Sequence, residues 1–139
     1  MLNKLTNKNY HILHIAALHN HPKIISYLLT SPECKKLELN PNSIDGDRCT
    51  LLHHAARKGC LESIKKILEL IPDILYKVDV RSNTALHYAA MNGISCFYVD
   101  HASSVKYLLY FDSDFDKLRK MGNTKGKLPK DLTVNKKCF

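Results

Sequence analysis

Apolar residues recur along this chain at spacings of three and four residues, which is the spacing of one face of an α-helix. The pattern is clearest over residues 24–29 and 64–68, where the intervening positions are mostly polar. Paired alanines precede these stretches at 16–17 and 55–56, and another pair occurs at 89–90. Alanine favours helix and is small enough to let a neighbouring helix approach closely. The pattern therefore predicts short amphipathic helices that come in pairs.

Three segments of the chain repeat one another in register. They read ILHIAALHNHPKIISYLL from Ile12, TLLHHAARKGCLESIKKIL from Thr50 and TALHYAAMNG from Thr84. Each contains Leu-His-x-Ala-Ala, and a residue that tolerates the left-handed helix-ending conformation follows three residues later: Asn20, Gly59 and Gly93. A fourth, partial copy, NTKGKLPKDL, begins at Asn123. Because neither helix of a pair can bury its apolar face alone, the pairs are expected to stack into one array.

These segments resemble the ankyrin repeat, whose consensus runs D-x-x-G-x-T-P-L-H-x-A-A-x-x-G-H-x-x-x-V-x-x-L-L. The resemblance implies an all-α solenoid of stacked helix-turn-helix pairs with hairpin-like loops between them. We expect a single ankyrin-repeat domain over residues 1–139. Its repeats are expected at about residues 7–44, 45–78 and 79–122, with a partial C-terminal repeat at 123–139.

The chain departs from the consensus in its loops and in its spacing. Arg48 and Ser82 stand where the consensus has the loop glycine. The sequence numbers of His14 and His53 differ by 39, whereas those of His53 and His87 differ by 34. The family spacing is about 33 residues. The first repeat therefore carries extra residues.

Residues 94–100 interrupt the third repeat between its two helices. An insert of this length, about two helical turns, could extend the second helix and keep its apolar face in phase. The stretch ISCFYV is rich in β-branched and aromatic residues, however, and these favour extended structure. We favour a protruding loop, with Asp100 as the N-cap of a helix that begins at His101. Phe97 and Tyr98 then either fold back onto the array or are offered to a partner.

The charge of the chain adds a preference for certain partners. The net charge is +8, and eight of the 21 basic residues lie between Lys117 and Lys137. Such a balance favours acidic partners and raises non-specific affinity for nucleic acid. No apolar run approaches the roughly 20 residues that span a bilayer, so we expect no membrane insertion. The five cysteines include no CxxC pair and indicate reduced thiols in an intracellular protein, cytoplasmic or nuclear.

The histidines are the residues that most invite a catalytic or metal-binding interpretation, but their positions argue against it. His14, His53 and His87 occupy the same place in three copies, which puts them a repeat apart and too far from one another to share a metal ion. In the resembled family this histidine binds the backbone of the hairpin-like loop. The acidic stretch 112–116 lacks the glycine and glutamate of a calcium loop, and no nucleophile elbow, phosphate loop or HExxH motif occurs. We therefore expect no enzyme activity, no metal and no cofactor.

Candidate partner-binding residues come from the spacing along the first helices and from the resemblance, which implies contacts through a concave surface and the loop tips. The first helices supply His19, Arg57, Lys58, Tyr88, Met91 and Asn92, with Ile15, His54 and Tyr88 expected to be half-buried. The loop tips supply Lys8, Tyr10, Asp47, Cys49, Arg81, Asn83, Lys125 and Lys127, and the insert adds Phe97 and Tyr98. The combined surface is basic with apolar spots.

The sequence thus favours a non-enzymatic protein–protein interaction module, an adaptor or inhibitor, that binds an acidic segment of another protein and takes no small-molecule substrate. Two alternatives stay open. One is a regulatory ankyrin module of a larger enzyme, although Met1 and the cap-like last repeat favour a complete chain. The other is a basic nucleic-acid-binding protein, which a steep salt dependence of binding would reveal.

Overall fold

The computed structural model describes residues 12–92, 99–114 and 116–133. These residues form eight α-helices and two 3₁₀ helices, and no strand occurs among them. The elements are α1 (Ile12–Leu18), α2 (Pro22–Thr30), α3 (Pro32–Lys35), α4 (Leu51–Lys58), α5 (Leu61–Leu70), η1 (Pro72–Tyr76), α6 (Ala85–Asn92), α7 (Val99–Phe111), α8 (Lys117–Lys120) and η2 (Pro129–Leu132).

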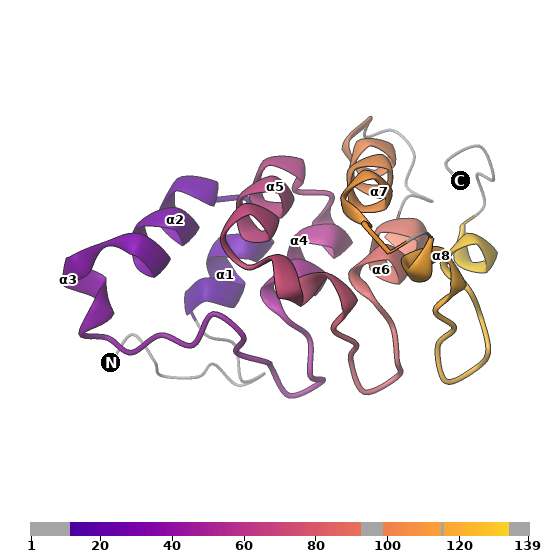
Figure 1. Ribbon diagram of the computed structural model, residues 1–139, viewed down its shortest axis with the longest axis horizontal. Coiled ribbons are helices and arrows are strands. Elements are labelled where there is room, and N and C mark those ends of the chain that lie inside the picture. The colour runs from indigo at the N-terminus through magenta and orange to yellow at the C-terminus, as the bar shows by residue number, and fades with distance from the viewer. Residues whose placement is uncertain (1–11, 93–98, 115, 134–139) are drawn as a thin grey trace.

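The helices lie in two rows (Figure 1). An inner row consists of α1, α4 and α6, each packed against the next, and η2 continues this row by packing against α6. An outer row consists of α2, α5 and α7, which pack against one another in the same order. Each inner helix also contacts the outer helix that follows it in the chain. This arrangement confirms the expected all-α stack of helix pairs.

The helix ends are set by local residues, of which Asn20 and Gly59 have the roles that the sequence predicts. Thr50 precedes α4, and its side chain accepts a hydrogen bond from the backbone amide of His53. Gly59 ends the same helix in the left-handed conformation, with φ of 69°. Asn20 does the same after α1, with φ of 56°. Pro22 then starts α2, where its missing amide hydrogen is no loss. These tight turns fold each outer helix back onto its inner helix.

The core lies between the two rows. The paired alanines of all three inner helices are buried, so the backbones of these helices approach closely. Leu13, Leu52 and Leu86 of the inner row are fully buried, and they belong to one apolar cluster with Ile64 and Leu108 of the outer row. Stability therefore depends on contacts between neighbouring pairs, as the repeated pattern predicts.

Three hairpin-like loops connect the pairs and share one hydrogen-bonding pattern. In each, the Oδ1 of the first residue accepts the backbone amides two and four residues later. The first residues are Asp45, Asp79 and Asn123. The residue at the fourth position is left-handed in every loop: Arg48 has φ of 61°, Ser82 59° and Gly126 69°. Replacing the consensus glycine has therefore left the loop shape unchanged, at a conformational cost of about 1–2 kcal/mol per non-glycine residue.

The two irregular regions of the sequence have different outcomes. The extra residues of the first repeat form α3, which packs against α2, and the turn that follows it. In the third repeat α7 begins at Val99, so the expectation that a helix begins at His101 with Asp100 as its N-cap is wrong. Asp100 instead belongs to the first turn of α7, because the helix starts two residues earlier than expected. The rest of the insert, including Phe97 and Tyr98, lies outside the described residues.

Candidate interaction surface

The tips of the three loops form a row along one edge of the stack. The backbone amide of Val80 donates to the carbonyl of Asp47 at 3.0 Å, and the amide of Thr124 donates to the carbonyl of Arg81 at 2.9 Å. Each loop is thus tied to the next. We call four exposed charged side chains of these tips the loop row: Asp47, Arg81, Lys125 and Lys127; Arg48, next to Asp47, is exposed as well. All four were predicted from the sequence.

The acidic residues that open the first two loops point inward. Asp45 and Asp79 are 7% and 5% exposed. One oxygen of each carboxylate accepts loop amides, and the other accepts a hydrogen bond from a side chain of the following inner helix, His54 or Tyr88. The charges left exposed on the loop row are therefore those of Arg81, Lys125 and Lys127, with one acid, Asp47.

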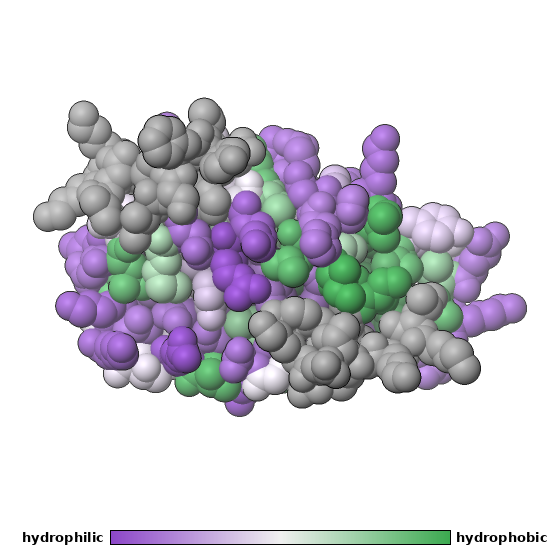
Figure 2. Space-filling view, turned by 180° about the vertical axis from the view of Figure 1, so that it is seen from behind, coloured by the Kyte–Doolittle hydropathy of each residue, from purple (hydrophilic) through white to green (hydrophobic). Residues whose placement is uncertain are grey.

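The exposed side of the inner helices forms a second patch, seen in Figure 2. We call it the inner-row face: Ile15, Leu18, His19, Arg57, Lys58, Met91 and Asn92. Hydrophilic side chains occupy the middle of this side, and the largest hydrophobic group lies toward the N-terminal helix pair, on the right of Figure 2. Helix α4, which carries Arg57 and Lys58, packs between α1, which carries Ile15, and α6, which carries Met91. The face thus has a basic centre and apolar flanks.

Some predicted site residues lie elsewhere. Asn83 is 5% exposed, and Cys49 is likewise buried, so neither is at a loop tip. Both are the last residue of a loop, where the chain turns inward to start the next helix. Of the three positions expected to be half-buried, Ile15 is exposed, His54 is buried and Tyr88 is half-buried. Four predicted residues lie outside the described part of the chain: Lys8, Tyr10, Phe97 and Tyr98.

The structure adds two apolar residues that the sequence reasoning passed over. Ile44 and Val80 are 47% and 51% exposed and lie beside the loop aspartates. In the sequence each is marked only by its place next to an aspartate, Asp45 or Asp79. They place apolar surface beside the basic side chains of the loop row.

The repeated histidines hold the loops, as the resemblance implies. His53 Nδ1 accepts from the amide of Thr50 at 3.1 Å, which leaves Nε2 to donate to the carbonyl of Asn83 at 2.9 Å. His87 makes the same pair of bonds with Thr84 and Lys127. Burial lowers the pKa of both histidines below the ordinary value, so they are neutral.

His14 acts one repeat earlier, where its Nε2 lies 3.0 Å from the carbonyl of Ser43. The described residues contain no group of three or more metal-ligating side chains, and no helix among them is long and apolar enough to cross a membrane. Through their bonds to loop carbonyls, the three repeated histidines hold the loops against the inner helices.

In the second and third repeats the position after the repeated histidine carries a linked polar network. His54 Nε2 lies 2.8 Å from Asp45 Oδ2, and the His54 ring meets the His14 ring edge-on at 5.3 Å. In the next repeat the Tyr88 hydroxyl donates to Asp79, and the Tyr88 ring meets the His53 ring edge-on at 5.5 Å. The two networks have the same geometry but different chemistry.

Burial sets the protonation of these groups. Burial, reinforced by the nearby positive charge of Arg57, lowers the pKa of His54 to about 4. Burial also raises the pKa of the Cys49 thiol to about 11, with the carboxylates of Asp45 and Asp79 acting in the same direction. Since the thiolate is the nucleophilic form, Cys49 is an inert structural thiol.

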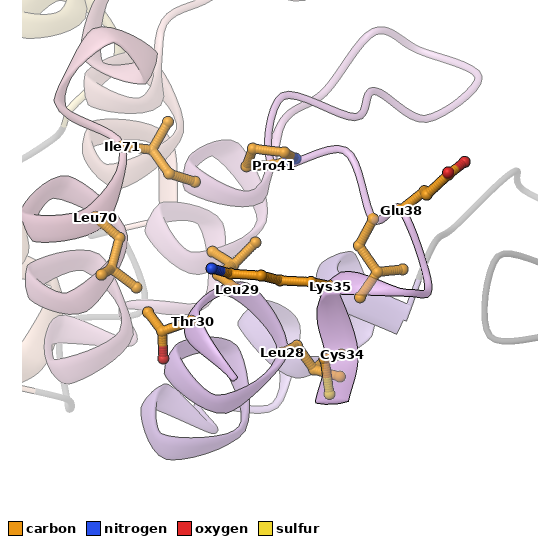
Figure 3. Close-up of a pocket in the computed structure, with 10 residues that line it drawn as sticks. Leu28, Leu29, Thr30, Cys34, Lys35, Glu38, Pro41, Leu70 and Ile71 are labelled. Atoms are coloured by element: carbon orange, nitrogen blue, oxygen red, sulfur yellow. The ribbon is translucent and has the colours of Figure 1, made fainter. Parts of the chain in front are cut away.

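A pocket of about 370 Å³ lies away from both patches, between α3 and the ends of α2 and α5 (Figure 3). Aliphatic side chains dominate its lining, among them Leu28, Leu29, Leu70 and Ile71. In Figure 3 the Lys35 side chain extends across the pocket toward α2. The extra residues of the first repeat include α3, which forms one wall of this pocket without filling it.

Comparison with known proteins accords with this geometry. The family model described as "Ankyrin repeats (3 copies)" matches residues 13–121. A curated protein of Arabidopsis thaliana, "Putative E3 ubiquitin-protein ligase XBAT31", is 33% identical to this chain over 110 residues. The aligned part is 78% of this chain and 21% of that protein, so the chain spans about a fifth of the length of this relative.

Proposed function

This chain belongs to the ankyrin-repeat family, and on that premise we propose that it is a non-enzymatic adaptor or inhibitor that binds an acidic segment of another protein. Ankyrin repeats are general protein-interaction modules. The proposed contact surface is the loop row together with the inner-row face. On this proposal the chain acts by masking the partner's surface or by tethering it, without a cofactor.

The inward orientation of the loop acids carries the proposal. Asp45 and Asp79 are buried and hydrogen-bonded, so they do not oppose an acidic ligand at the surface. Arg57 and Lys58 belong to the inner-row face, and the other bases of the proposed surface, Arg81, Lys125 and Lys127, belong to the loop row. A segment with carboxylates and a few apolar side chains complements this distribution.

Charge reversal tests the proposed surface. We expect the double variant Arg57→Glu, Lys58→Glu to lose its partner in crosslinking from native extract followed by mass spectrometry. The matched control is Lys23→Glu, Lys36→Glu, which changes the net charge equally at two exposed residues outside the proposed surface. The control should retain the same crosslinked protein, because like charges at the contact, and not the lower total charge, oppose binding.

Two results would contradict the proposal. One is equal capture of the partner by both double variants, since binding would then not use this face. The other is capture of nucleic acid in place of protein, with an affinity that falls steeply as salt rises. Circular dichroism of each variant checks that the helices are retained.

A second candidate function rests on the similarity to the Arabidopsis ligase. We propose, as this alternative, that the repeats are the partner-recruiting module of a larger enzyme such as a ubiquitin ligase. Immunoprecipitation of the native protein, with its mass and any ubiquitin transfer measured, separates the two. A native mass near 15.9 kDa without ligase activity favours the stand-alone adaptor.

A further inference from the structure

We propose that the buried Asp45–His54 pair positions the guanidinium of Arg57, and that Arg57 is thereby the pre-oriented anion-binding residue of the inner-row face. The consequence for ligand binding rests on the function proposed above, whereas the positioning itself rests on the geometry alone. His54 touches no ligand in this scheme and acts as a positioning residue.

The geometry forms a chain from the first loop to the surface. Asp45 Oδ2 lies 2.8 Å from His54 Nε2, and both residues are buried. His54 Nδ1 lies 3.4 Å from Nη2 of Arg57, one helical turn further along α4. Arg57 is partly exposed at the centre of the inner-row face. A loop carboxylate thus reaches a surface cation through one imidazole.

The donors and acceptors allow one arrangement of protons. A guanidinium has only donors, so His54 Nδ1 must accept from Arg57. In a neutral imidazole the other nitrogen then carries the hydrogen, and Nε2 donates to the Asp45 carboxylate. The carboxylate therefore fixes the tautomer of His54, and that tautomer supplies the acceptor that orients Arg57.

This chain of contacts is specific to the second repeat among the three whose inner helices the structure describes. In the third repeat the equivalent positions hold Tyr88 and Met91, and in the first they hold Ile15 and Leu18. Only Arg57 combines a fixed positive charge with a buried acceptor beneath it. Orientation matters for arginine because its planar fork binds a carboxylate through two parallel hydrogen bonds. A fork held in place loses less freedom on binding.

The variant Asp45→Asn tests the positioning with little change to the loop. Asn123 already opens the third loop and accepts the amides of Lys125 and Lys127, both at 3.0 Å, so an asparagine can build this loop. The side-chain amide nitrogen of the introduced asparagine would donate to His54 Nε2 and shift the imidazole hydrogen to Nδ1. That hydrogen then faces the donors of Arg57, and the guanidinium loses its imidazole acceptor.

Asp79→Asn is the matched control, because it makes the same change one repeat later, where Tyr88 can rotate its hydroxyl and no arginine follows. Hexaglutamate serves as the acidic probe. We expect Asp45→Asn to weaken its binding about three- to tenfold, as Arg57→Ala does, and Asp79→Asn to leave binding unchanged or tighter. In the Arg57→Ala background Asp45→Asn should produce no further loss. Removal of a negative charge alone would tighten binding, so weaker binding identifies positioning.

Nitrogen-15 NMR of the free protein gives a readout that needs no ligand. We expect the His54 hydrogen on Nε2 in the wild type and on Nδ1 in Asp45→Asn, together with faster rotation of the Arg57 guanidinium in the variant. A wild-type His54 with its hydrogen on Nδ1, or hexaglutamate binding that Asp45→Asn leaves equal or tighter while Arg57→Ala weakens it, would overturn the positioning. Failure of hexaglutamate to bind the wild type, with the expected NMR result, counts against the proposed function while supporting the positioning.

Discussion

The junction between α1 and α4 and the junction between α4 and α6 use equivalent positions filled by different residues. At the first junction Asp45 bonds His54, whose ring meets His14. At the second Asp79 bonds Tyr88, whose ring meets His53 edge-on at 5.5 Å, against 5.3 Å at the first junction. The position that holds His54 in the first network can take up a proton in acid, with a pKa of about 4, whereas the tyrosine at the equivalent position of the second network stays neutral there.

The junctions also differ in hydrogen bonding and in packing. The buried Ser43 hydroxyl at the first junction has no hydrogen-bond partner among the described residues. The pocket beside α3 lies on the same side of the stack, between α2 and α5. We infer that the same repeat geometry accepts different side chains at equivalent positions. We also infer that the first junction is less stable and more pH-sensitive than the second.

Removal of the loop-binding histidine is expected to have the largest effect. His53 lies in the middle inner helix, which packs against both neighbours, whereas His14 lies in a helix with one inner-row neighbour. His53→Ala leaves buried partners unsatisfied and a cavity, and we expect a loss of about 3 kcal/mol in the free energy of unfolding. His14→Ala should lose about half as much. Urea unfolding measures both, and a larger loss for His14→Ala would contradict the comparison.

The second largest effect is expected from acid, which should lower the stability of the first junction. The folded-state pKa of His54, about 4, lies below its ordinary value of 6.5, so its stabilising effect is complete above pH 6.5 and is lost as the pH falls toward 4. Asp45, Arg57 and His14 are the charged and titratable groups that face it. Between pH 7.5 and 4.5 the loss from this one group should be about 2–3 kcal/mol in the free energy of unfolding.

The substitution His54→Tyr gives the first junction the tyrosine of the second. It should remove the pH dependence of the free energy of unfolding that His54 causes. Burial lowers the pKa of His53 and His87 as well, so a dependence of the same sign remains. The reciprocal Tyr88→His should add a comparable dependence at the second junction. Urea unfolding at both pH values gives the answer, and equal pH dependence in the wild type and His54→Tyr would show that the pair at the first junction is not the sensitive element.

Enlarging one leucine on each side tests the packing difference. Leu70 lines the pocket near α3, whereas Leu108 is fully buried in α7. Leu70→Phe should change stability by no more than about 0.5 kcal/mol, because the ring can enter the pocket. Leu108→Phe should destabilise by about 1–3 kcal/mol, because the space is already filled. Similar losses for both in thermal unfolding would mean that the pocket is not available to a side chain.

The parts of this molecule that the sequence predicts are those set by short-range rules. The Leu-His-x-Ala-Ala segments and the Asn20 and Gly59 turns follow from local spacing, so the helix pairs and their stacking could be predicted. The role of His53 was implied by the resemblance to the ankyrin repeat. The burial of Asn83 and His54 could not, because it depends on which loop from the neighbouring repeat lies against each position. The pocket depends on how α3 packs, and no periodic pattern encodes that.

The smallest effects are expected where the junctions are alike, in the loops. Arg48 and Ser82 hold the same left-handed conformation in successive loops. Arg48→Gly and Ser82→Gly should each stabilise the protein by about 0.5 kcal/mol, because the relief of backbone strain exceeds the added freedom of the unfolded chain.

Gly126→Ala is the reciprocal change. A Cβ there meets no atom within 4 Å, so its loss of about 1 kcal/mol would come from φ alone. Thermal unfolding measures all three. Equal gains in the free energy of unfolding at Arg48 and Ser82 would show that the two loops contribute equally to stability. The different acid response of the junctions would then be attributed to His54 and Tyr88. Unequal gains would place part of that difference in the loops themselves.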